Sequence, residues 1–162
     1  MTVEIRAARP GDEAGLWRIL GPIIRAGETY SIPRDLPRED ALKFWLGPNK
    51  STFVAVDGDE LLGTYYLMRN KEGGGSHVCN CGYMTGEWAR GRGIARLMGQ
   101  HSQVIARSEG FRAMQYNLVV STNKVAIRLW QQLGFDIVGT LPGAFNHPAL
   151  GDVDAHIMYK RL

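Results

Sequence analysis

The sequence predicts one mixed α/β (α+β) domain over residues 1–162, and three observations lead to this prediction. A chain of 162 residues is one domain of ordinary size and can bury a core without disulfides or metals. Strand-like and helix-like patterns follow one another in the order β-α-α-β-β-β-α-β-α-β-β. The sequence contains no internal repeat. Such an order predicts a sheet flanked by helices.

The first half of the chain supplies five of these elements. Pro10 and Asp12 mark the start of the first helix, because proline and aspartate are favoured at helix N-termini. The sequence DGDE between two β-rich runs indicates a hairpin. The expected apolar stripe of the first helix is Leu16, Ile19, Leu20 and Ile23. The predicted elements are a strand at 2–8, helices at 9–27 and 37–46, and two strands within 51–70.

The second half begins with KEGGGS, which predicts a flexible loop, and continues with strands and helices in alternation. Gly110 and Gly134 follow the two predicted helices, where glycine commonly ends a helix. A loop rich in Gly, Pro and Asn is expected between the last two strands. The predicted strands lie at 77–86, 112–120, 135–141 and 154–162, and the helices at 93–108 and 124–133.

Composition and charge exclude several classes of protein. The net charge of +3 is small and the basic residues are spread out, so we do not expect nucleic-acid binding. No run approaches the roughly 20 apolar residues of a membrane span. The N-terminus lacks the apolar run of a secretory signal, which favours the cytoplasm. Cys79 and Cys81 are too close together for a disulfide, and with His77 as the only further ligand nearby we expect no metal site.

The stretch EWARGRGIARLMGQ, residues 87–100, places glycines and arginines at the start of a predicted helix. Gly91 and Gly93 allow the backbone to approach a ligand closely, because glycine has no Cβ. Arg90, Arg92 and Arg96 add positive charge. The free N–H groups of a helix N-terminus bind anions. The sequence therefore predicts a phosphate or pyrophosphate site.

Two common phosphate loops do not fit this stretch. A P-loop needs Lys followed by Ser or Thr, where Arg92 and Gly93 stand. A dinucleotide-binding loop needs a third glycine where Arg96 stands, and no carboxylate lies near the twentieth residue beyond it. A third pattern, R/Q-x-x-G-x-G/A, is matched by Arg90, Gly93 and Ala95.

With this pattern and a second one, the chain resembles the GNAT superfamily of N-acetyltransferases. Further along, NKVAIRLWQQLGF at residues 123–135 resembles the family's N-x-x-A-x-x-L-[YF]-x-x-x-G-F helix, and the resemblance extends over the whole chain. It implies a mixed, mostly antiparallel sheet of about seven strands, with splayed fourth and fifth strands. It also implies acetyl-CoA as the cosubstrate, without a metal.

The resemblance implies where acetyl-CoA lies. Its pantetheine arm is expected between the splayed strands, paired with Met84 and Thr85, while nearby backbone N–H groups polarise the thioester carbonyl. The expected cofactor-binding residues are Met84, Thr85, Arg90, Gly91, Arg92, Gly93, Ile94, Ala95, Arg96 and Asn123.

The implied reaction is direct attack of a neutral amine on the thioester. Many relatives protonate the departing thiolate with a tyrosine of the last helix, whereas this chain has Trp130 there. An indole N–H is too weakly acidic for that role. The loss is tolerable, because a thiol with a pKa of about 8.5 leaves as a fairly stable thiolate.

Several collinear segments, including SHVCNCGYM and LPGAFNHP, are similar to the acetyltransferase group that acts on the proline analogue azetidine-2-carboxylate. This implies that Asn80 binds the acceptor carboxylate beside Tyr83. Asn117 and Leu118 are expected at the reacting amine and its water, and Asn123 near the thiol. Asn117 and Asn123 are thus the expected catalytic residues, although an amide can only orient a water and cannot act as a base.

The sequence does not identify the acceptor amine. A small amine, such as an amino acid or an analogue, is the leading hypothesis. A peptide or protein amine is one alternative, and a non-catalytic acyl-CoA-binding module is another. Glu28, Tyr30 and His147 could touch an acceptor or be plain surface residues. Relatives of this family often pair, so a homodimer is compatible with the sequence.

Overall fold

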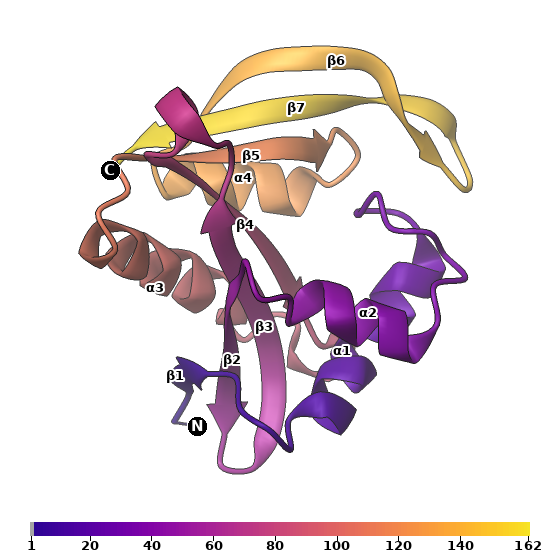
Figure 1. The fold of residues 1–162 in the computed structure, drawn as a ribbon. Coiled ribbons are helices and arrows are strands. Elements are labelled where there is room, and N and C mark those ends of the chain that lie inside the picture. The colour runs from indigo at the N-terminus through magenta and orange to yellow at the C-terminus, as the bar shows by residue number, and fades with distance from the viewer. Residues whose placement is uncertain (1) are drawn as a thin grey trace.

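One seven-stranded sheet, in the order β1-β2-β3-β4-β5-β7-β6, forms the centre of the computed structural model, which describes residues 2–162 (Figure 1). Neighbouring strands run antiparallel, except for the parallel pair β4 and β5. This confirms the predicted fold class. The strands are β1 (Glu4–Ala7), β2 (Ser51–Asp57), β3 (Glu60–Arg69), β4 (Val78–Thr85), β5 (Ala113–Val120), β6 (Asp136–His147) and β7 (Gly151–Arg161), and the helices are α1 (Glu13–Ala26), α2 (Arg38–Trp45), α3 (Ile94–Ser108) and α4 (Lys124–Gln132).

Helices cover both faces of the sheet, and each face has its own apolar core. On one face α1 and α2 pack on β2, β3 and β4 around Leu16, Leu20, Trp45 and Met84. On the other face α3 and α4 pack on the sheet. The largest members of that second core are Leu62, Tyr65, Leu67, Ile94, Met98, Met114, Tyr116, Trp130, Phe135 and Met158.

The apolar stripe of α1 differs slightly from the expected one. Leu16, Ile19 and Leu20 are buried as predicted, but Ile24 is buried in place of Ile23, which is only half-buried. Position 24 follows position 20 by four residues, one turn of the helix, so it continues the stripe that the other three residues define.

The last hairpin is longer than the sequence indicated. The residues expected as a loop belong to β6 and β7, and only residues 148–150 separate the two strands. β6 lies at the edge of the sheet, where Pro142 costs no ladder hydrogen bond on its outer side, and shifts of register before Phe145 absorb the irregular segment. Figure 1 shows the hairpin extending past the end of β5.

The parallel strands β4 and β5 separate soon after they begin. They pair only at Val78–Ala113 and Cys79–Met114, so a gap opens between their later residues. The N–H of Gly86 donates to Leu62 O at 2.8 Å. Because hydrogen-bonding edges alternate along a strand, the backbone N–H and C=O groups of the even-numbered residues of β4 point towards β3. The backbone groups of residues 81, 83 and 85 therefore face the gap.

Candidate active site

A cleft of about 1330 Å³ lies over the gap between β4 and β5, with walls from α1, α4 and the start of α3. Except for Arg92, every residue that the sequence analysis placed at the cofactor or the substrate lines it. Glu28, Tyr30 and His147 line it as well. We call the part beside the start of α3 the cofactor half and the part beside α1 and α2 the acceptor half, after the ligands that the sequence predicts there.

The turn before α3 leaves backbone N–H groups free and open space around its two glycines. Gly91 and Gly93 adopt left-handed backbone conformations, with φ of 75° and 76°, and a Cβ added at either would meet nothing within 4 Å. Gly93 is the N-cap of α3, so no side chain caps the free N–H groups of the first turn. These groups stand at the positive end of a 15-residue helix. The turn therefore suits a pyrophosphate, as the sequence predicted.

The arginines near this turn have different positions. Arg90 and Arg96 line the cleft, and Arg96 donates to the side chain of Gln132. Arg92 does not line it, and its guanidinium pairs with Asp57 at 3.3 Å. The guanidinium of Arg92 is thus held by the last residue of β2, and its contact with the cofactor stays a prediction. Arg128 of α4, which the sequence analysis missed, also lines the cleft.

Met84 and Thr85, the residues expected to pair with pantetheine, differ in orientation. The backbone of Thr85 faces the gap. The backbone of Met84 faces Thr64 of β3, and its side chain packs in the core beneath α1. Met84 thus contributes only its side chain to the cleft, because successive residues of a strand alternate their hydrogen-bonding edge.

Asn80 and Tyr83 lie on opposite faces of β4, since side chains alternate along a strand. The ring of Tyr83 packs on Trp130, with 4.7 Å between ring centroids. Its hydroxyl is 2.7 Å from Ser102 Oγ and 2.9 Å from the hydroxyl of Tyr116. Tyr83 therefore reaches the cleft from the α3 side. It does not form the aromatic wall beside Asn80 that the sequence predicted.

Asn117 is held in place by two other amides. Its Oδ1 accepts from Gln115 Nε2 at 2.9 Å, and its Nδ2 donates to Asn70 Oδ1 at 2.7 Å. Asn70 and Gln115 were not among the residues predicted from the sequence. The spacing of two residues between Gln115 and Asn117 on one strand face was the available signal. Asn123 Oδ1 accepts from the N–H of Ala126 at 3.3 Å, so it also caps α4.

The groups around Trp130 supply no strong acid and no reactive nucleophile. Trp130 is a buried core residue that also lines the cleft. Burial raises the pKa of the Tyr83 and Tyr116 hydroxyls well above the ordinary value. Burial, with Cys79 nearby, likewise raises the pKa of the Cys81 thiol. All three groups stay neutral around pH 7.

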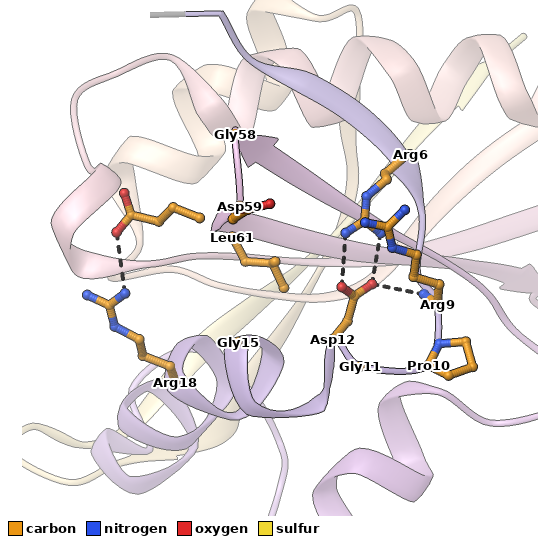
Figure 2. A pocket seen from close by; sticks show the side chains of 11 residues that line it. Arg6, Arg9, Pro10, Gly11, Asp12, Gly15, Arg18, Gly58, Asp59 and Leu61 are labelled. Carbon is orange, nitrogen blue, oxygen red and sulfur yellow. Dashed lines mark hydrogen bonds and ion pairs between the residues drawn. The ribbon is translucent and has the colours of Figure 1, made fainter.

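A second pocket, of about 380 Å³, lies at the other end of α1 (Figure 2). Four of its charged side chains form two pairs. Arg6 donates two hydrogen bonds of 2.9 Å to Asp12, and Arg18 contacts Glu60 at 3.3 Å. The N–H of Arg9 donates to Asp12 at 2.8 Å. These contacts fasten the start of α1 to β1, and a later turn of α1 to the first residue of β3.

The gap beside β4, the uncapped start of α3 and the arginines have the arrangement expected of an acyl-CoA-dependent transferase. Residues 17–135 match the acetyltransferase (GNAT) family. The chain belongs to this family and is an N-acetyltransferase that uses acetyl-CoA.

Two proteins illustrate the likeness. The chain is 30% identical over 151 residues to the N-acetyltransferase aca1 of Schizosaccharomyces pombe, covering 83% of this chain and 72% of that protein. A GCN5-related N-acetyltransferase from Kribbella flavida has a similar structure, with a TM-score of 0.94, 41% identity and coverage of 99% of this chain and 98% of that one.

A more distant structure shares the fold. It is a phosphinothricin acetyltransferase from Sinorhizobium meliloti in complex with AcCoA, with a TM-score of 0.87 and 21% identity, covering 100% of this chain and 89% of that one. Across residues 2–162, no helix has the length and apolar character needed to cross a membrane. The described residues also contain no cluster of three or more side chains suited to a metal ion.

Proposed function

We propose that this acetyltransferase modifies a small primary or secondary amine, an amino acid or an analogue. The observation that carries the proposal is the composition of the acceptor half of the cleft. Asn80 and Asn117 place neutral amides there, and Ile19, Ile23 and Phe44 add apolar surface. Amide N–H groups can donate to a carboxylate, and apolar walls suit a small aliphatic body.

In the cofactor half, the first turn of α3 and the side chains of Arg90, Arg96 and Arg128 would hold the pyrophosphate. The gap-facing backbone of Thr85 would pair with the pantetheine arm. Acetyl-CoA supplies an activated thioester carbonyl. A gap-facing N–H of β4 would polarise it, and a fixed backbone dipole of this kind stabilises the developing oxyanion.

The proposed step is direct transfer. The amine nitrogen forms a bond to the carbonyl carbon, the carbon–sulfur bond breaks, and the amine loses one proton to a water that Asn117 orients. A covalent cysteine intermediate is disfavoured, because the raised pKa of Cys81 keeps its thiol protonated. The thiolate leaves and takes its proton from solvent, since the buried tyrosines are weaker acids than the thiol.

Release of free thiol tests this function. The protein is incubated with acetyl-CoA and a panel of amino acids that includes proline and cyclic analogues. We expect release that needs both substrates. No release above the acetyl-CoA blank with any amine would count against the proposal. Binding of coenzyme A without turnover would favour a non-catalytic acyl-CoA-binding module.

A peptide or protein amine is the second candidate acceptor. The structure offers one observation against it: His147, near the tip of the β6–β7 hairpin, lines the same cleft as residues 28–32, so two segments border the acceptor half. A panel of peptides with free N-termini or lysines, measured by the same assay, decides between the two.

We also propose that the chain forms a homodimer. β6 is an edge strand in which Ile137, Val138 and Leu141 are exposed, and apolar edge strands tend to pair with another chain. Sedimentation equilibrium over a range of concentrations measures the state directly, and a single species with the monomer mass at all of them would contradict the proposal.

A further inference from the structure

The connection between α1 and α2 places a tyrosine hydroxyl against the strand that borders the cofactor gap. We call residues 27–37 the strap. At its base, Arg25 Nη1 donates to Arg34 O at 2.5 Å and Arg34 Nε donates to Arg25 O at 2.9 Å. Within the strap, residues 28–32 line the cleft, and Tyr30 is the residue that reaches β4.

The hydroxyl of Tyr30 makes two hydrogen bonds to the backbone of one residue. It donates to Tyr83 O at 2.5 Å and accepts from Tyr83 N–H at 2.6 Å. A single hydroxyl thus takes the place that a residue of a neighbouring strand would have. The ring lies edge-on to Trp45, with 6.3 Å between ring centroids, so the core beneath α2 also holds this side chain.

Tyr83 is the gap-facing residue next to Thr85 along β4. If pantetheine pairs with Thr85, the thioester lies deeper in the gap, and the next backbone groups that it meets are those of Tyr83. An N–H that already donates to Tyr30 is not free to polarise a carbonyl. An acyl group that uses this N–H must therefore displace the hydroxyl of Tyr30.

We propose that Tyr30 is a positioning residue that links the two halves of the cleft. Without acyl-CoA, its hydroxyl holds the backbone of Tyr83 and ties the strap down. When the acyl group takes the N–H of Tyr83, the hydroxyl is released and the strap, which lines the acceptor half, rearranges. This inference rests on the proposed use of a β4 N–H to polarise the thioester.

The variant Tyr30→Phe tests the link, because it keeps the ring on Trp45 and removes only the hydroxyl. If a ligand must displace a bonded group, only the fraction of protein in which that group is already released can bind it. The apparent Kd is then the intrinsic Kd divided by this fraction. We expect the Kd of acetyl-CoA, measured by calorimetry, to fall by about threefold to tenfold in the variant. Tyr66→Phe is the matched control, since within residues 2–162 its hydroxyl makes no hydrogen bond to β4, and its Kd should equal that of the wild type.

Thermal unfolding separates this link from a purely structural role. Without ligand, Tyr30→Phe should unfold at a lower temperature than the wild type, because it lacks two hydrogen bonds. With saturating acetyl-CoA, the difference should shrink, since the wild type no longer makes them. The inference would be overturned if acetyl-CoA left the difference in unfolding temperature unchanged. It would also be overturned if the Kd of the Tyr30→Phe variant were equal to or higher than that of the wild type. If the wild type itself failed to bind acetyl-CoA, the proposed function would fall as well.

Discussion

At the scale of single residues, two backbone properties explain most of the geometry of the site: the φ angle of a residue and the edge of the strand towards which its N–H and C=O groups point. Gly91 and Gly93 are needed for their left-handed φ, and space around them is open where a ligand would lie. Thr85 and Tyr83 reach the gap through their backbones, whereas Met84 cannot. Asn117 owes its orientation to Asn70 and Gln115. Each of these properties leads to a measurable effect of substitution.

The variant Gly93→Asp should weaken acetyl-CoA binding by at least about tenfold, because it places a carboxylate beside the expected pyrophosphate. Gly110→Asp is the matched control. Gly110 also has a left-handed φ, 87°, with nothing within 4 Å of an added Cβ, but it lies beyond the far end of α3. The control should lose stability through the same backbone strain and keep its Kd. Equal affinities for all three proteins would remove this turn from the cofactor site.

The variant Asn80→Ala should raise the KM of the acceptor at least about tenfold, because a hydrogen bond to a charged group contributes about 1.5–3 kcal/mol. The KM of acetyl-CoA should hardly change, since Asn80 lies on the α1 side of β4. Steady-state kinetics with the best amine from the panel measures both constants. If neither constant moved, Asn80 would not be the carboxylate ligand. Asn146→Ala on β6 serves as a surface control, because Asn146 does not line the cleft.

At the scale of elements, the pair of Arg6 and Asp12 fixes the start of α1 against β1. The hydrogen bonds from Arg6 lower the pKa of Asp12 below its ordinary value. At neutral pH, Asp12→Asn should reduce the free energy of unfolding by about 1.5–3 kcal/mol, the range for hydrogen bonds to charged groups. Glu60→Gln is the control. It breaks the exposed pair with Arg18 and should cost about 0–1 kcal/mol.

The same pair predicts a pH dependence. Because the folded pKa of Asp12 lies below the unfolded value of about 3.9, the unfolded chain binds the proton more readily. The stabilisation is complete above about pH 4–5 and is lost as the pH falls through the lowered folded pKa. Denaturant unfolding of wild type and Asp12→Asn at pH 7 and near pH 3 should show a smaller difference at the acid pH. A constant difference would contradict this account.

At the scale of the whole molecule, the cleft draws on both halves of the chain, from α1 to α4, so acetyl-CoA should bind only the folded protein. At a concentration 100 times Kd it should add about 2.7 kcal/mol to the free energy of unfolding. A thermal or denaturant titration with acetyl-CoA measures this gain. The Gly93→Asp protein at the same ligand concentration should gain less. A wild type that gains nothing would exclude specific binding.

Much of the fold could be predicted from the sequence, because local patterns determine it. The β-rich runs, the helix caps and the glycine turns gave all of the main elements in order. The last hairpin was too short in the prediction, because Pro142 and the neighbouring glycines are typical of loops, and only an edge position makes them acceptable in a strand. The cofactor turn was predicted because its residues are adjacent in sequence.

The sequence by itself determined the family and the cosubstrate and predicted an anion-binding turn, since the residues that carry these properties lie within short, continuous motifs. Only the tertiary structure decided which groups meet across elements. It paired Arg92 with Asp57, put Asn80 and Tyr83 on opposite faces of β4, joined Asn70 to Asn117, and brought Tyr30 to the backbone of Tyr83. Such contacts depend on strand register and on the packing of distant segments, and no local pattern encodes them.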